Sequence, residues 1–202
     1  MFGGSCLLTF DIPIVFLFFI PLVVLLIRRN YKNIPFSKSL IFVIFYIHVV
    51  VVIGITLFPI PFQKELLHDL KASHIESSIN FVPFLSIIKI LSLHSIGTGF
   101  AQIGGNFLLL LPLGIYLPLL FYRVNSFKRV SFIVCLCSFM IESMQFFISL
   151  ILNYHYKAVD VDDVILNTLG GQFGYLIYRI TIPSIERNVD LSRFTNNLRF
   201  KE

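Results

Sequence analysis

The sequence predicts an all-α protein, a polytopic bundle of about five transmembrane helices with one short helix at the external surface. Hydrophobic residues make up 56% of the 202 residues and charged residues 13%, whereas soluble domains contain about 45–50% and about 25%. The mean hydropathy is +0.86. The apolar residues gather in runs of roughly 16–23 residues, each long enough to cross about 30 Å of hydrocarbon as a helix. These observations exclude a soluble globular domain.

The predicted membrane spans are the five longest apolar runs, residues 12–27, 40–58, 105–122, 130–152 and 164–182. The first run has Asp11 before it and Arg28 and Arg29 after it. A signal peptide has the opposite polarity and a small-residue cleavage site. We therefore expect the first run to be a retained helix.

Prolines shape two of these runs. Pro59 and Pro61 end the second run, because proline has no N–H to donate and its ring clashes with the preceding turn. Pro112, Gly114 and Pro118 lie inside the third run and predict a kinked helix.

The segment between the second and third runs is predicted to be external, yet it is not simply hydrophilic. Residues 81–93 are apolar but too short to span, which favours an interfacial or re-entrant helix. Pro83 lies near its start, where a helix tolerates proline. Residues 94–100 predict a flexible loop, and residues 183–202 a polar, basic tail at the cytoplasmic face.

The basic residues predict the orientation. Four Lys or Arg follow the first run, three follow the third, and five lie at or beyond the end of the fifth, out of 16. The other four fall on the opposite side. The positive-inside rule then places the N-terminus outside and the C-terminus in the cytoplasm. The formal charge of +5 follows from this asymmetry and does not indicate a nucleic-acid partner.

The cysteines indicate neither a disulfide framework nor a zinc site. Cys135 and Cys137 lie two positions apart, about 200° around a helix, and Cys6 is near the N-terminus. We interpret all three as packing residues.

Glu142 lies near the middle of the fourth run, where a charged side chain costs about 2.5–3.5 kcal/mol. Gln145 and Ser149 lie three and seven positions further on, along the same helical face. This polar stripe predicts a site at membrane depth. A structural role remains open, in which Glu142 is protonated and bonded to a neighbouring helix.

Further polar residues fall near the external ends of the other spans. Asn106 opens the third run, and Asp160, Asp162 and Asp163 precede the fifth. Asp163 shares a helical face with Asn167, four positions later. We expect these groups to form a polar vestibule open to the outside, with Glu142 as its floor. Capping roles for Asn106 and for each aspartate stay open.

Small residues and histidines are assigned to packing. Gly170, Gly171 and Gly174 include a GxxxG pair, which lets membrane helices approach closely, so we expect the fifth span to pack against the fourth. His48, in the middle of the second run, is interpreted as a core residue.

Four motifs resemble the VanZ-like family of membrane proteins: Asn80–Phe84, Asn106–Gly114, Ile141–Gln145 and Asp160–Gly170. The resemblance covers about residues 53–179. It implies a bacterial cytoplasmic-membrane protein with an N-terminal helix and basic loop in residues 1–39, a four-helix domain in 40–182 and a tail in 183–202. Lys157 stands where the family typically has arginine, and lysine lacks the planar fork that binds carboxylate or phosphate.

The family pattern also implies functional residues, namely Asn80, Pro83, Asn106, Glu142, Gln145, Asp160, Asp163 and Asn167. The founding member is linked to low-level resistance to teicoplanin, a glycopeptide antibiotic. The resemblance thus implies a phenotype and no defined reaction.

Three functions remain open on the sequence alone. The first is a non-enzymatic protein without a cofactor that lowers sensitivity to glycopeptides by binding a lipid-linked cell-wall precursor or a lipoglycopeptide. Its ligand-binding residues would be Asn106, Glu142, Gln145, Lys157, Asp160, Asp163 and Asn167. The second is an enzyme acting on an outer-leaflet phospholipid or polyprenyl phosphate, with Mg²⁺ on Asp160, Asp162 and Asp163. The third is a transporter or proton-coupled channel with Glu142 as relay. Membrane lipids are expected partners, and a homo-oligomer stays open.

Overall fold

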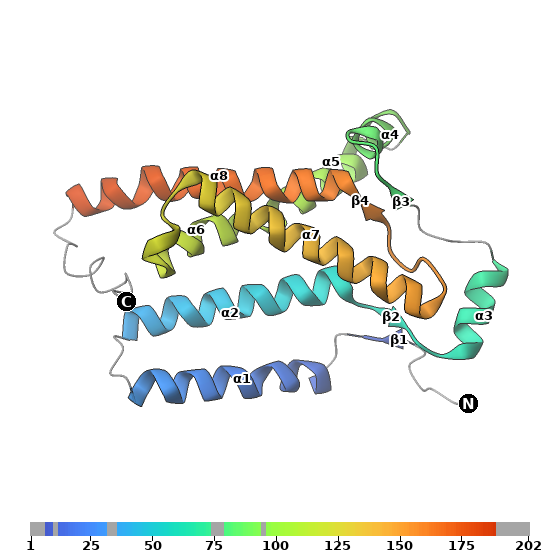
Figure 1. Cartoon of the computed structure of the whole chain (residues 1–202), viewed down its shortest axis with the longest axis horizontal. Coiled ribbons are helices and arrows are strands. Elements are labelled where there is room, and N and C mark those ends of the chain that lie inside the picture. The colour runs from blue at the N-terminus through green and yellow to red at the C-terminus, as the bar shows by residue number, and fades with distance from the viewer. Residues whose placement is uncertain (1–6, 10–11, 32–35, 74–78, 94–95, 189–202) are drawn as a thin grey trace.

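The computed structural model describes residues 7–9, 12–31, 36–73, 79–93 and 96–188 (Figure 1). The helices are α1 (Ile12–Tyr31), α2 (Phe36–Leu57), α3 (Lys64–Ala72), α4 (Leu85–Leu93), α5 (Ile96–Leu109), α6 (Leu111–Leu120), α7 (Phe127–Leu152) and α8 (Val161–Asn188), with a 3-10 turn at Tyr122–Val124. Each predicted apolar run is helical, so the all-α fold is confirmed.

Within the described residues, three helical stretches are long and apolar enough to cross a membrane, namely Ser39–Leu57, Gly99–Leu120 and Phe127–Leu152. The predicted total of five spans is not confirmed. The apolar stretch described in α1, Phe18–Arg28, is shorter, and α8 carries Asp162, Asp163 and Asn167 in its first turns. The predicted orientation and the interfacial placement of α4 stay predictions.

The third predicted span is broken, as its prolines indicated, and it begins earlier than expected. Leu110 has non-helical backbone angles between α5 and α6 (φ −106°, ψ 5°), and Pro112 lies in the first turn of α6. The helix breaks there because Pro112 cannot donate a hydrogen bond and its ring excludes the carbonyl four residues earlier. The prediction of a loop was wrong for residues 96–100, because α5 already begins at Ile96, while residues 94–95 lie outside the described part of the chain.

Two short strand pairings supplement the helices. β1 (Leu7–Leu8) pairs antiparallel with β2 (Ile60–Pro61), and β3 (Ile79–Asn80) pairs parallel with β4 (Val159–Asp160). Two-residue strands have no hydropathy period, so the sequence could not reveal them. The second pairing ties the segment before α4 to the start of α8.

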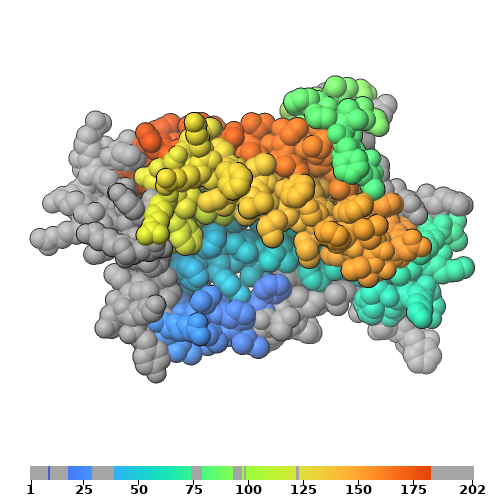
Figure 2. All heavy atoms as spheres, in the orientation of Figure 1, coloured from blue at the N-terminus to red at the C-terminus, as the bar shows by residue number. Residues whose placement is uncertain are grey.

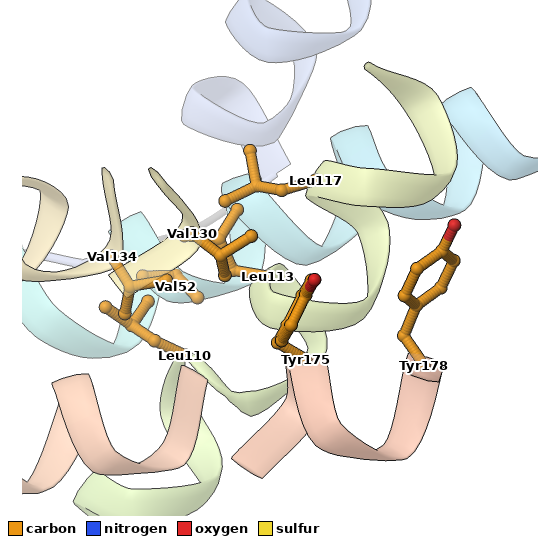
Figure 3. Packing of buried hydrophobic residues seen from close by; sticks show 8 residues of the cluster. All are labelled: Val52, Leu110, Leu113, Leu117, Val130, Val134, Tyr175 and Tyr178. Carbon is orange, nitrogen blue, oxygen red and sulfur yellow. The ribbon is translucent and has the colours of Figure 1, made fainter. Parts of the chain in front are cut away.

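Helix α8 packs against α5, α6 and α7, while α2 packs on α6 and α7, and α1 on α2. Helix α4 projects from the body beside the start of α8 (Figures 1 and 2). Figure 3 shows the apolar core, to which α8 contributes Tyr175 and Tyr178 and α7 contributes Val130 and Val134. Large apolar side chains such as Phe132 and Ile151 remain exposed, as suits a surface in contact with lipid.

Glycines set the distance between α8 and its neighbours. A Cβ on Gly170 would lie 1.8 Å from the Phe107 carbonyl oxygen, and one on Gly174 would lie 2.0 Å from that of Leu111. The GxxxG face therefore packs on α5 and α6. Gly171 faces Val134 of α7, so the expected packing on the fourth span holds for that glycine and not for the GxxxG pair.

Alanine at Gly170 should destabilise the bundle by roughly 1–3 kcal/mol, because the new methyl group meets a helix backbone rather than a side chain that can rotate away. Gly104→Ala is the matched control, since a Cβ there meets nothing within 4 Å. Thermal unfolding in detergent measures both variants. Equal stability of the two variants would contradict the close contact of α8 with α5.

Candidate functional site

A polar cavity of about 390 Å³ lies among α2, α5, α7, α8 and the loop before α8. It contains six of the seven side chains predicted to bind a ligand. Those six are Asn106, Glu142, Gln145, Lys157, Asp163 and Asn167. Ligand pockets in proteins span about 300–1,000 Å³, so the cavity is large enough for a small polar group.

Glu142 is 7% exposed, and it both accepts a structural hydrogen bond and lines the cavity. Its Oε2 accepts a hydrogen bond from the backbone N–H of Asp160 at 2.9 Å, and its side chain also lines the cavity. The structural role left open for Glu142 is therefore present, with a backbone N–H of β4 as the partner. The carboxyl group connects α7 to the start of α8 and still leaves Oε1 for the cavity.

Gln145 is held from α2. Its Nε2 donates to the Thr56 carbonyl oxygen at 2.9 Å, while its Oε1 is buried and has no hydrogen-bond partner among the described residues. Buried polar atoms in proteins almost always have a partner. An acceptor without a partner, in a side chain that lines a cavity, is a candidate contact for a ligand donor.

Asn167 repeats this arrangement on α8. It is 2% exposed, and its Nδ2 donates to Ser138 Oγ at 2.9 Å. Its Oδ1 has no partner within the described part of the chain. Ser138 was not singled out from the sequence, although it lies four residues before Glu142 on the same face of α7 and extends the polar stripe.

Asn106 and Lys157 complete the wall. Asn106 Nδ2 donates to Asp163 Oδ1, which joins α5 to α8.

Lys157 Nζ donates to the Ile55 carbonyl oxygen at 2.9 Å, and partial burial lowers the pKa of its ammonium group. In the same loop the Tyr156 hydroxyl donates to the Leu57 carbonyl oxygen at 3.1 Å, and burial raises the pKa of Tyr156 to about 12. The C-terminal turn of α2 thus anchors the loop.

Asp160 is the predicted ligand residue that does not line this cavity. Its Oδ1 accepts from the Asp162 backbone N–H at 2.9 Å, which caps α8, and from Asn80 Nδ2, also at 2.9 Å. The capping role left open for Asp160 is therefore observed. Asn80, which only the family resemblance indicated, holds this cap from β3.

Asp162 binds the start of α4. Its carboxylate accepts from the backbone N–H groups of Phe84 (2.5 Å), Ser86 (2.9 Å) and Ile87 (3.2 Å). A carboxylate is stabilised there because a helix N-terminus presents unpaired N–H groups and a partial positive charge. Pro83 lies in the turn that brings these N–H groups to Asp162.

The three aspartates therefore have separate partners. Asp160 caps α8, Asp162 binds α4 and Asp163 binds Asn106. Among the described residues, no group of three or more His, Cys, Asp or Glu side chains is placed to hold a metal ion. The proposed Mg²⁺ cluster finds no support in this arrangement.

An apolar pocket of about 290 Å³, which the sequence did not reveal, lies on the other side of Glu142. Phenylalanines dominate its lining, with Phe81 from the segment before α4 and Phe139, Phe146 and Phe147 from α7. Phenylalanines at this spacing are typical of any lipid-facing helix, so the sequence pattern alone does not indicate a pocket.

Comparison with known protein families matches the VanZ/LLP1 family over residues 44–182. The chain belongs to the VanZ/LLP1 family. The match runs from within α2 to within α8 and includes every residue that lines the polar cavity. No curated protein and no solved structure matches the sequence significantly. The family membership predicted from the four motifs is thus confirmed.

Two substitutions of Glu142 in this VanZ/LLP1 protein should show whether its hydrogen bond or its charge contributes to stability. Glu142→Gln keeps an oxygen acceptor for the Asp160 N–H, so the free energy of unfolding should change little. Glu142→Leu leaves that N–H unpaired and should cost about 1–3 kcal/mol. Thermal unfolding measures both, with the exposed neighbour Met140→Leu as control. Equal losses in the Gln and Leu variants would contradict the assigned hydrogen bond.

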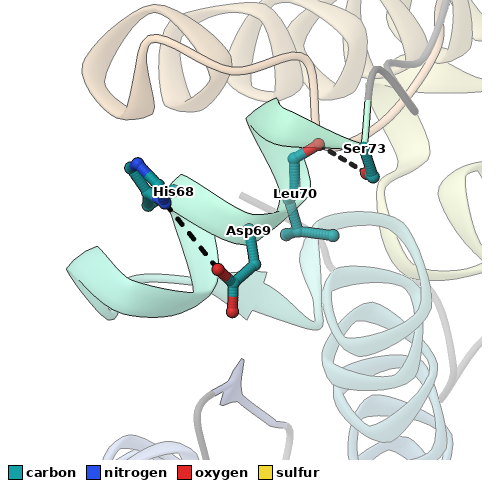
Figure 4. Close-up of polar contacts among 4 residues, drawn as sticks. All are labelled: His68, Asp69, Leu70 and Ser73. Atoms are coloured by element: carbon teal, nitrogen blue, oxygen red, sulfur yellow. Dashed lines mark hydrogen bonds and ion pairs between the residues drawn. The ribbon is translucent and has the colours of Figure 1, made fainter.

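Removal of the Asp162 carboxylate should release α4. In Asp162→Ala the backbone N–H groups of residues 84, 86 and 87 lose their shared acceptor, so their hydrogen exchange should accelerate while α7 stays protected. Asp69→Ala is the control, because Asp69 lies exposed on α3 beside His68, 3.7 Å away (Figure 4). Unchanged exchange in residues 84–87 would show that Asp162 does not hold α4.

Proposed function

We propose that this protein binds the polar head of a membrane amphiphile in the cavity and thereby lowers the sensitivity of the bacterial cell to teicoplanin-type glycopeptides. The observation that carries the proposal is the convergence of six polar side chains, from three helices and a loop, on one cavity. Polar and ionisable groups at membrane depth are costly, and where they persist they line functional cavities or pathways.

Two amphiphiles suit the proposal, a lipid-linked cell-wall precursor and the acyl-bearing antibiotic. Retention of the precursor would reduce the target that the drug reaches, and retention of the antibiotic would reduce the free drug. Both require a cavity that opens to the outer leaflet, as the positive-inside rule predicts. The apolar pocket beside Glu142 offers a surface for a hydrocarbon chain near the cavity.

No specific observation favours the enzymatic alternative. The carboxylates of Asp160 and Asp162 are engaged by N–H donors. A divalent ion bound by carboxylates would have to displace these donors.

A susceptibility panel tests the proposal in cells that carry wild type, Asp163→Ala, Gln145→Leu or Glu142→Gln, with membrane abundance measured for each. The teicoplanin concentration that stops growth should fall in the first two variants to the level of cells without the protein. Glu142→Gln should retain protection, since glutamine keeps an acceptor. Met144→Ala, exposed on the same helix, is the control.

A glycopeptide without an acyl chain distinguishes the two amphiphiles. Protection confined to the acylated drug indicates retention of the antibiotic, and protection against both indicates retention of the precursor. Full protection by Asp163→Ala and Gln145→Leu at normal abundance would contradict a role for the cavity.

A further inference from the structure

The hydrogen-bonding groups of the cavity are unequally used. One N–H of each of three amides has a partner, because Gln145 Nε2 donates to the Thr56 carbonyl, Asn106 Nδ2 to Asp163, and Asn167 Nδ2 to Ser138. The acceptors Gln145 Oε1 and Asn167 Oδ1 are buried without a partner among the described residues. Two buried oxygen acceptors of side chains that line the cavity are therefore left without any donor from the described part of the chain.

The hydrogen bond to Thr56 identifies which atom of the Gln145 amide is the oxygen. The oxygen and nitrogen of a side-chain amide can be assigned either way round only if both orientations form acceptable hydrogen bonds with the neighbouring groups. A carbonyl oxygen accepts and never donates, so the group facing Thr56 must be the nitrogen. The oxygen of Gln145, whose side chain is 7% exposed, is consequently the atom left for a ligand.

Charge favours the same kind of ligand. Two carboxyl groups, Glu142 and Asp163, line the cavity against the single ammonium of Lys157, which donates to the Ile55 carbonyl. A phosphate inside would face both carboxyl groups. A cation would be paired with them, as a buried charge requires.

We infer that the cavity takes a primary ammonium group carried by a membrane amphiphile. Three N–H donors of one ammonium match the free acceptors of Gln145 and Asn167 and a carboxyl oxygen of Glu142 or Asp163. The inference rests on the proposed function and narrows it: the phosphate of such a lipid stays outside the acidic part of the cavity, on the side of Lys157. The apolar side chains of Leu109 and Ile141 suit the carbon atoms next to the ammonium.

Two adjacent glycines of α5 provide a matched pair for the test. Gly105 lines the cavity and Gly104 does not, yet a Cβ at either position meets nothing within 4 Å. Leucine at Gly105 should fill the α5 side of the cavity without disturbing the helix packing. Leucine at Gly104 makes the same change in composition and helix propensity and should leave the cavity open.

The experiment reconstitutes the full chain in phosphatidylglycerol vesicles that contain a minor fraction of phosphatidylethanolamine. Native mass spectrometry then counts the lipids that stay on the protein. A parallel sample replaces phosphatidylethanolamine with its N-acetyl derivative, which keeps the phosphate and chains but loses the charge and two donors. We expect the amine lipid to be retained about tenfold over the derivative, as the loss of one charged hydrogen bond implies.

The variants locate the site. Gly105→Leu should abolish the retention of both lipids. Gln145→Met and Asp163→Asn should lower the retention of the amine lipid about tenfold, by the same estimate, so that its preference over the derivative is lost. Gly104→Leu should match wild type. Excess free ethanolamine should compete weakly, because it lacks the hydrocarbon chains.

Each contrary outcome has a distinct meaning. Equal retention of the amine lipid and its derivative, with loss in Gly105→Leu, would overturn the ammonium assignment and leave amphiphile binding intact. Competition by free ethanolamine as strong as by the lipid would overturn the assignment to an amphiphile. Retention of none of the lipids by wild type would overturn the inference and, with a negative susceptibility panel, the proposed function as well.

Discussion

The start of α8 is the constraint on which the rest of the structure depends. Asp160 caps α8 and is held by Asn80, Asp162 holds the first N–H groups of α4, and the Asp160 N–H is held by Glu142. Backbone groups at a buried helix end cannot turn to water, so each must find a partner inside the protein. Two neighbouring aspartates thereby connect β3, α4, α7 and α8 at one point.

The glycine contacts of α8 determine where the cavity walls stand. Because Gly170 lies against the backbone of α5 and Gly174 against that of α6, Asn167 and Asp163, one and two turns earlier, come within reach of the side chains of α5 and α7. A larger residue at either glycine would separate the helices and pull the polar groups apart. The packing of these glycines therefore determines the shape of the cavity on which the proposed function depends.

The residues implied by the VanZ/LLP1 pattern divide into two physical roles. Asn80 and Asp160 build the junction before α8, and Asn106, Gln145, Asp163 and Asn167 face the cavity. Glu142 belongs to both groups. A phenotype lost on substitution of Asn80 or Asp160 would thus report the loss of structure. Gln145 also has a structural bond, from its Nε2 to Thr56, and only its Oε1 has no partner among the described residues.

Hydropathy, proline positions and the polar stripe of α7 were enough to predict the long apolar helices and six of the polar side chains that line the cavity, because these signals act within one or two helical turns. The broken span at Leu110 follows from Pro112 in the same local way. The sequence could not show that Asn80 bonds Asp160, 80 positions away, or that Asp162 binds a helix rather than a metal. Those pairings exist only once close packing of α8 brings distant backbone groups into a space that excludes water, where every donor must be matched.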